Sequence, residues 1–247
     1  RPSEIKKVFS DNSVLGKDEV VNVLMEFAPG NELVKILNKW DGQCELSSSA
    51  CSIYYYYSRV FMEGLLKERI GEERFNAFTK TADYWQSYRH FMRSNKSSWF
   101  DKPKEDYVLK SLEMVKKELS IKFGSDIKDW AWGNLHKIEF QHIMGAKKPL
   151  NHLFNLGPYP SPGGYAQVNN FSAARIDKDF NVKSGPSTRR IVDYSNPNKF
   201  WSILPTGNSG NVLSPHYKDQ VDKYLKGEFF EVSLKKERKA SLVINPE

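Results

Sequence analysis

The chain contains little cysteine, and this scarcity excludes two common kinds of site. Its 247 residues include two cysteines, Cys44 and Cys51, and no CxxC pair. A dithiol redox motif and a cysteine-based zinc site are therefore unsupported. Two reduced, half-buried thiols are the preferred expectation, and a disulfide between Cys44 and Cys51 is the alternative.

The chain also lacks long apolar runs and a recognisable leader. No run reaches the roughly 18 apolar residues that a membrane span needs, so no span is expected. The first residues, Arg1-Pro2-Ser3-Glu4, lead into mixed polar sequence rather than an apolar signal core. We therefore expect any targeting segment to lie outside this sequence, and no compartment is predicted.

What the chain does contain is positive charge and aromatic side chains. The net charge is +7, and 13% of the residues are aromatic. Such a chain could act as a basic module that binds nucleic acid through phosphate contacts and stacking. However, the basic residues are scattered, the aromatic ones fall on predicted core faces, and no RNP, KH, zinc-finger or helix-turn-helix pattern is present. A solvated basic surface and no nucleic-acid partner are expected. The densest basic cluster is Lys235, Lys236, Arg238 and Lys239.

Residues 1–130 are predicted to be mostly helical. Apolar residues recur there at helical spacing, and acidic or capping residues precede them. We expect these apolar faces to lie in the core. Helices are expected to start near Lys17, near Glu32, at residues 47–49, at Asp83, and after Asp101-Lys102-Pro103 with an end at Gly124.

Residues 131–247 are predicted to be strand and loop, because eight of the twelve prolines and six of the fifteen glycines fall between residues 147 and 215. Helices followed by strands favour an α+β fold over alternating βαβ units. We expect one incomplete domain with a helical first half. Short strands are expected at residues 165–174, 187–194, 200–204 and 229–234.

The motif Gly207–Gln220 contains unusually many turn-forming residues between a strand-like and a helix-like run. Ser214 is a good N-cap and Pro215 a good first helical residue, which predicts a helix over residues 216–226 that Gly227 ends. Gly207 and Gly210 would form the turn before it. The buried face of this helix would comprise Tyr217, Val221 and either Tyr224 or Leu225.

The same motif could be taken for a catalytic triad of Ser209, His216 and Asp219. A GxSxG elbow requires glycine two residues after the serine, and Asn211 stands there. His216 and Asp219 would also lie on one helical turn, whereas triads bring separate elements together. The capped helix is therefore preferred over the triad.

A metal-binding domain is a further alternative. The chain has five histidines, and no two of them have the i, i+4 spacing of a helical zinc pair. Asp177, Asp179 and Asp193 could join an oxygen-rich calcium site. Structural or surface roles are preferred, so neither a metal nor another cofactor is predicted. The histidines are His90, His136, His142, His152 and His216.

A series of short motifs runs through most of the chain in a fixed order. They are Trp40-Asp41-Gly42, Trp132-Gly133, Leu135-His136, Phe140, His142, Pro149-Leu150, Leu153-Phe154-Asn155, Gly157-Pro158, Pro160, Gly163-Gly164, Val168-Asn169, Gly185-Pro186-Ser187, Arg189, Ile191-Val192-Asp193, Asn196-Pro197, Leu204-Pro205, Gly207-Asn208-Ser209-Gly210, Ser214-Pro215-His216-Tyr217 and Asp219-Gln220. This series resembles the β chain of penicillin acylases (penicillin amidases), most closely over about residues 130–232. The chain departs from that family at Tyr165, where many relatives have Asp, and at Asn208, where Gln is usual.

The resemblance implies an N-terminal-nucleophile hydrolase with an αββα sandwich. Such enzymes are precursors that cleave themselves into an α and a β chain. The first residue of the β chain, normally Ser, attacks an amide, with its own α-amine as base. The parent would be an amidase that acts on small linear N-acyl amides such as penicillins.

This chain resembles the C-terminal part of such a β chain. Arg1 and Pro2 carry no hydroxyl or thiol, and the residues after Ser3 do not resemble the family's β-chain start. We therefore expect no catalytic, cofactor-binding or metal-binding residue here, and no activity of the chain alone. Its expected partners are the rest of the β chain and the α chain. Apolar faces left exposed would favour self-association of the fragment.

Overall fold

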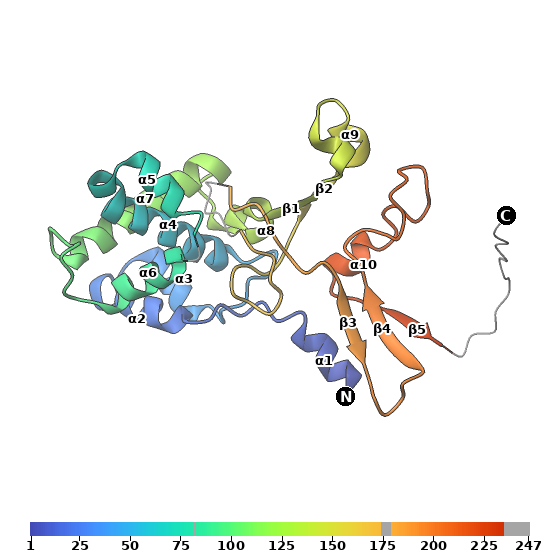
Figure 1. Cartoon of the computed structure of the whole chain (residues 1–247). Helices are drawn as coiled ribbons and strands as arrows, with labels where there is room; N and C mark the ends of the chain where they lie inside the picture. The colour runs from blue at the N-terminus through green and yellow to red at the C-terminus, as the bar shows by residue number, and fades with distance from the viewer. Residues whose placement is uncertain (82, 174–178, 235–247) are drawn as a thin grey trace, which may run out of the picture. The chain divides into compact units, whose positions relative to one another are not determined.

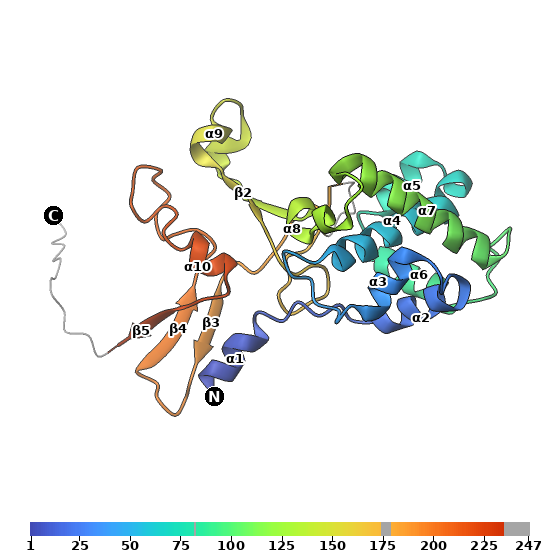
Figure 2. The same ribbon diagram turned by 180° about the vertical axis from the view of Figure 1, so that it is seen from behind.

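A computed structural model describes residues 1–81, 83–173 and 179–234 of the chain (Figure 1). These residues form two compact units. The larger unit comprises residues 10–186, and the smaller one combines residues 1–9 with the described residues from 187 onward. Figure 2 shows the same ribbon from behind. The predicted division at residue 130 concerns secondary structure along the chain and stays a prediction.

The larger unit contains the helices that the sequence predicted, together with a short one at residues 72–78 that it did not predict. Asn31 and Ser48 cap two of them, because their side chains accept hydrogen bonds from the amides of Leu33 and Cys51. The last long helix ends at Gly124, which adopts a φ of 93°. The helices are α2 (Lys17–Phe27), α3 (Glu32–Lys39), α4 (Ser49–Ile70), α5 (Glu72–Phe78), α6 (Asp83–Arg93) and α7 (Lys104–Phe123).

Helix α4 forms the centre of this unit because it is buried on nearly every side. Its four successive tyrosines, residues 54–57, are each at most 4% exposed. The helix contacts α3, α5 and α7, as expected of a helix that is apolar all round. The buried guanidinium of Arg59 pairs with Glu63 and Glu118, which compensates its charge. The predicted core faces are thus confirmed here.

A hairpin follows the long helices. After η1 (Ile127–Trp130) and α8 (Trp132–Leu135), strand β1 (Lys137–Phe140) pairs antiparallel with β2 (Leu156–Pro160). The connection between the strands contains η2 (Ile143–Ala146) and α9 (Asn151–Phe154). The other edge of β1 is also occupied, since the Lys137 carbonyl accepts a 2.8 Å hydrogen bond from the amide of Val182.

The strand predicted at residues 165–174 is wrong for the part that is described. Residues 165–173 contain one isolated bridge, Ser172 to Ser184, and no strand. The main-chain partners of this region are spread over different loops. The amide of Gly163 donates to the Cys44 carbonyl, and the amide of Asn169 to the Asp11 carbonyl. A ladder needs one continuous neighbour, so no strand forms.

The expectation of reduced thiols is also wrong, because Cys44 and Cys51 form a disulfide. Both residues are fully buried. Between them the chain reverses at Ser48, whose amide donates to the Glu45 carbonyl and whose hydroxyl accepts from the Cys51 amide. This cap brings the two Cα atoms to 5.3 Å, within the range that a disulfide requires.

The smaller unit is a three-stranded antiparallel sheet with two short helices. Strand β4 (Lys199–Ile203) lies between β3 (Arg189–Val192) and β5 (Phe230–Ser233). All three were predicted to within two residues. The helices are α1 (Pro2–Val8) and α10 (Val221–Leu225). Helix α1 contacts β3, and Lys6 on α1 lies 4.8 Å above the ring of Trp201 on β4.

The two faces of this sheet differ in burial. On one face Arg189, Ile191 and Ile203 are at most 6% exposed. On the other, Val192 stands opposite Phe200, which stands opposite Val232. Val192 is 51% exposed and the neighbouring Phe230 is 38% exposed. One face is thus packed within the unit, and the other is open.

The described chain is a mixture of helices and small antiparallel sheets, which agrees with the expected combination of α and β elements at this coarse level. Within the described ranges, none of the helices combines the length and the apolar character that crossing a bilayer would need.

Candidate functional site

The motif Gly207–Gln220 forms a closed loop at the end of β4, and Gln220 closes it. The Gln220 side-chain oxygen accepts a hydrogen bond of 2.9 Å from the amide of Leu204, and its main-chain amide donates to the Thr206 carbonyl at 2.8 Å. Its side-chain nitrogen donates to the Asn208 side chain at 3.3 Å. One buried side chain therefore joins both ends of the loop.

Gly207 is needed because the loop crosses itself at this residue. A Cβ on Gly207 would lie 2.0 Å from the His216 carbonyl oxygen and 2.7 Å from a carboxylate oxygen of Asp219. A Cβ on Gly210 would meet no atom within 4 Å. The two glycines of the motif thus have different roles, which the sequence alone does not distinguish.

The helix predicted to start at Ser214 is wrong over its first half, because α10 begins only at Val221. In a helix, the Gln220 amide would donate to the His216 carbonyl four residues earlier. Here that amide donates to Thr206, and the His216 carbonyl accepts from Ser209. Bonds across the loop have replaced the first helical turn. Ser214 instead accepts from the His216 amide in a local turn.

The predicted end and buried face of this segment are confirmed. Gly227 follows α10 with a φ of 70°. Tyr217, Val221 and Tyr224 are buried, and Leu225 is half-buried. The Arg189 guanidinium packs 4.5 Å above the Tyr224 ring and donates to the Tyr224 carbonyl. Burial raises the pKa of Tyr224 to about 12 and lowers the pKa of Arg189.

His216 and Asp219 form an exposed pair with 2.9 Å between Nδ1 and a carboxylate oxygen. Ser209 contacts His216 only through the main chain in the bonds described above, and its hydroxyl accepts from the Asn211 amide. Among the described residues, no serine hydroxyl is hydrogen-bonded to the His216 ring. The loop therefore contains a His–Asp pair, and the absence of a triad stays a prediction.

This pair borders a cleft of about 800 Å³ on the open face of the sheet. The floor is formed by apolar side chains of the three strands and the wall by the motif loop. The lining residues are Arg190, Val192, Phe200, Ser202, Leu204, Asn208, His216, Asp219, Gln220, Phe230 and Val232. An apolar floor with a polar rim is typical of a surface that another chain or ligand covers.

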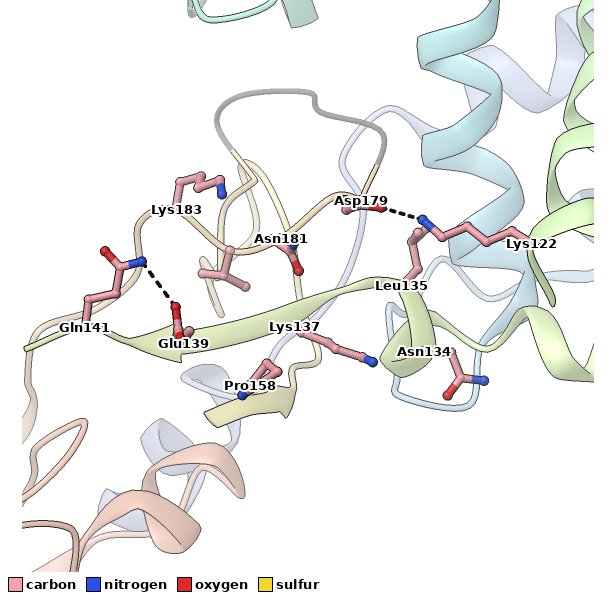
Figure 3. A pocket seen from close by; sticks show the side chains of 11 residues that line it. Lys122, Asn134, Leu135, Lys137, Glu139, Gln141, Pro158, Asp179, Asn181 and Lys183 are labelled. Atoms are coloured by element: carbon pink, nitrogen blue, oxygen red, sulfur yellow. Dashed lines mark hydrogen bonds and ion pairs between the residues drawn. The ribbon is translucent and has the colours of Figure 1, made fainter. Parts of the chain in front are cut away.

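A second cleft, of about 670 Å³, lies beside β1 in the larger unit (Figure 3). Lys122 of α7 and Asp179 face each other across it at 2.6 Å, and Gln141 donates to Glu139 at 3.2 Å. The lining mixes amides, lysines and carboxylates: Lys122, Asn134, Leu135, Lys137, Glu139, Gln141, Pro158, Asp179, Asn181, Val182 and Lys183.

The metal-site hypothesis finds no support in the described part of the chain, which contains no group of three or more potential metal ligands. Asp179 pairs with Lys122. The Asp193 carboxylate accepts two hydrogen bonds from Ser195, and these lower its pKa. Asp177 lies outside the described residues. Asp179 and Asp193 belong to different units of the chain.

The aromatic residues that could stack on nucleic acid lie mainly in the core. Tyr54–Tyr57, Tyr84, Trp85 and Tyr88 are each at most 6% exposed. The predicted basic cluster at Lys235, Lys236, Arg238 and Lys239 lies outside the described residues. The absence of a nucleic-acid partner stays a prediction.

No signal in the sequence marks the environment of His136. It is the most constrained histidine in the described chain. It is fully buried at the end of α8. Its Nδ1 lies 2.6 Å from the Phe180 carbonyl oxygen and its Nε2 2.9 Å from that of Phe171. The ring stacks on Trp132 at 4.5 Å. Neither carbonyl partner has a sequence signal, since both lie more than 30 residues away.

Comparison with known proteins connects these features to one family. The family model described as penicillin amidase matches residues 1–241, nearly the whole chain. The chain belongs to the penicillin amidase family. The ordered motif series had indicated the same family, and that prediction is confirmed.

Among curated proteins, the chain is similar to acyl-homoserine lactone acylases of pseudomonads. It is 28% identical over 217 residues to the acyl-homoserine lactone acylase QuiP of Pseudomonas aeruginosa, which covers 78% of this chain and 26% of that protein. It is 26% identical over 216 residues to QuiP of Pseudomonas fluorescens strain Pf0-1, with 83% and 26% covered. The chain thus spans about a quarter of the length of these relatives.

Among solved structures, the chain resembles the thermostable penicillin G acylase of Alcaligenes faecalis. The TM-score is 0.57 at 15% identity, over 99% of this chain and 50% of that one. At this identity the likeness concerns the fold. It agrees with the mixed helix and sheet architecture described above.

Proposed function

We propose that this chain is one part of an acylase-type amide hydrolase and that other parts of the enzyme supply the reacting nucleophile. The observation that carries this proposal is the match of the penicillin amidase model to residues 1–241, combined with the quarter of each relative that the chain spans. An enzyme of this family needs a hydroxyl or thiol beside a base. In the described residues His216 pairs with Asp219, and no serine hydroxyl is hydrogen-bonded to the His216 ring.

The role proposed for this chain is structural support of the catalytic centre. The sheet β3-β4-β5 would belong to an αββα sandwich whose remaining strands and helices lie in the rest of the β chain and in the α chain. The open face with Val192 and Phe230 supports this assignment, because an exposed apolar sheet face is stabilised when a second layer covers it. The structure would then be incomplete by itself.

The proposed substrates of the whole enzyme are linear amides of small N-acylated amines. The family name points to penicillin-type amides, and the names of the relatives point to acyl-homoserine lactones. Both contain an amide that joins an acyl group to a small amine. These two compound types are therefore the substrates to test first.

The test compares the purified chain with the precursor encoded by the whole parent gene. Each is incubated with a chromogenic phenylacetyl amide and with N-acyl-homoserine lactones, and the released amine is measured. We expect turnover by the processed precursor and none by the chain alone. Turnover by the purified chain that His216→Ala or Ser209→Ala abolishes would contradict the proposed division of roles. An inactive precursor on both substrates would contradict the acylase assignment.

A further inference from the structure

The two ring nitrogens of His136 both face main-chain carbonyl oxygens. Nδ1 is 2.6 Å from the oxygen of Phe180 and Nε2 is 2.9 Å from that of Phe171. A carbonyl oxygen can only accept a hydrogen bond. A neutral imidazole has one N–H donor and one lone pair, whereas an imidazolium has two donors. Both contacts are hydrogen bonds only if His136 carries both protons; in the neutral ring, one lone pair would point at a carbonyl oxygen.

The surroundings of His136 compensate part of the cost of burying this charge. The ring stacks on the face of Trp132 at 4.5 Å with 16° between the planes, and Trp132 in turn stacks on Tyr55 at 4.9 Å. A cation over an indole face is stabilised by the ring quadrupole. Hydrogen bonds from a charged donor are stronger than those from a neutral one. Burial opposes the charge, but the neutral ring cannot satisfy both carbonyl groups.

His142, at the other end of β1, provides a natural comparison within the same chain. Its Nδ1 accepts a hydrogen bond of 3.1 Å from the amide of Met144. In this bond the ring nitrogen acts as an acceptor. Its ring also stacks on an aromatic side chain, Phe154, at 5.1 Å. The two histidines therefore differ in the direction of their hydrogen bonds and not in the presence of a stacked ring.

We propose that His136 is held as the imidazolium in the folded chain, and that its charge fastens residues 179–183, one wall of the cleft in Figure 3, to strand β1. Phe180 lies within this segment, and the neighbouring amide of Val182 donates to the Lys137 carbonyl. The hydrogen bond from the His136 ring to the Phe180 carbonyl and the main-chain hydrogen bond from Val182 to Lys137 hold the segment at two points. Loss of the His136 proton removes the first of them. His136 is thus a positioning residue for the cleft.

Several other titratable groups lie near His136. The phenols of Tyr55 and Tyr165 line the same small space, and burial raises the pKa of Tyr55. Asp179, next to Phe180, is exposed and paired with Lys122. Lys137 follows His136 on β1. Arg175, Asp177 and Lys178 lie outside the described residues. Experiments below about pH 9 keep tyrosine phenols, which titrate near 10, protonated.

The direct test is the ¹⁵N NMR spectrum of the histidine side chains in the full chain, with His136 assigned from the spectrum of His136→Gln. We expect both ring nitrogens of His136 to be protonated at neutral pH. They should remain so above about pH 7.5, one unit beyond the free imidazole midpoint of about 6.5. His142, whose Nδ1 accepts a hydrogen bond, is the reference in the same spectrum. An unprotonated ring nitrogen in His136 at neutral pH would overturn the proposal.

The consequence for the cleft is tested by amide hydrogen exchange at Val182. The folded chain binds the His136 proton more tightly than the opened one does. The protection is therefore complete at low pH and is lost as pH rises through the folded-state midpoint. Between the open-state midpoint, about 6.5 for a free imidazole, and the folded-state midpoint, protection corrected for intrinsic exchange should fall about tenfold per pH unit, as the linkage of one proton requires, and it should level off above the folded-state midpoint. The amide of Gly133, bonded to Leu46, is the reference.

Matched variants separate charge from packing. His136→Gln should lower Val182 protection and remove its dependence on pH, whereas His142→Gln should leave both unchanged. Asp179→Asn should preserve the slope, and loss of the slope in that variant would assign the effect to Asp179 and overturn the proposal. If His136→Gln does not fold, assignment by elimination from the other four histidine variants still decides the protonation state.

Discussion

Helix α4 and the sheet β3-β4-β5 bury their apolar side chains to different degrees. Phe61 on α4 is fully buried, between the rings of Tyr57 and Tyr88. Phe230 on β5 is 38% exposed and stands beside other apolar side chains on the open face. The helical interior is therefore complete within the described chain, whereas the sheet presents an apolar face that stays partly exposed, with the motif loop at its edge and Lys223 4.8 Å above the Phe230 ring. This difference is what a part of a larger enzyme would show, and it can be tested residue by residue.

The largest expected effect comes from truncating the same side chain in the two regions. Phe61→Ala should lower the free energy of unfolding by about 3–5 kcal/mol, because it leaves a cavity in a closed core. Phe230→Ala should cost less than about 1 kcal/mol, since much of that ring is already in water. Urea unfolding followed by circular dichroism measures both. Equal losses would mean that the two regions are packed alike and would remove the contrast.

An intermediate effect is expected inside the motif loop. Gly207→Ala should destabilise the loop by about 1–3 kcal/mol, because the added methyl group overlaps the His216 carbonyl. Gly210→Ala, with open space around it, should change stability by less than about 0.5 kcal/mol. Amide exchange of Gln220, bonded to Thr206, reports on loop closure. Equal exchange in the two variants would show that the loop does not need the close approach at Gly207.

The smallest effect concerns the open sheet face itself. We expect the purified chain to self-associate through this face at high concentration. Val192→Ser should weaken the association roughly tenfold, because burying a valine contributes about 1.5 kcal/mol and a factor of ten equals about 1.4 kcal/mol. Ile121→Ser is the matched control, since Ile121 is 76% exposed on helix α7. Light scattering distinguishes the outcomes, and a wild-type monomer at high concentration would contradict the expectation.

The sequence predicted those elements whose signals are local. Asn31 and Ser48 cap helices at the positions where their side chains bond to the next amides along the chain. Strand β4 was recognisable as a compact apolar run, and the ordered motifs identified the family. The caps and the strand depend on residues within a few positions of one another, and the family depends on the order of short motifs along the chain, so all of them are visible without the fold.

The features that the sequence missed depend on bonds between distant residues. The segment from Ser214 to Gln220 has good helix-starting residues, but its amide and carbonyl groups bond across the loop to Thr206 and Ser209. Residues 165–173 have strand-like composition but lack a continuous neighbour. The preference for reduced cysteines was wrong because the chain reverses at Ser48. This reversal brings the sulfur atoms of Cys44 and Cys51 together.

By itself the sequence determined the helical core, the strands of the small sheet and the family, because periodicity and capping are properties of neighbouring residues and motif order is a property of the linear sequence. Only the tertiary structure decided how the remaining hydrogen-bonding groups are paired. The same chemistry that makes Ser214-Pro215 a good helix start yields a turn once Gln220 bonds to Thr206. Likewise, a histidine near a strand becomes a candidate buried cation once two carbonyl groups from distant segments face its ring.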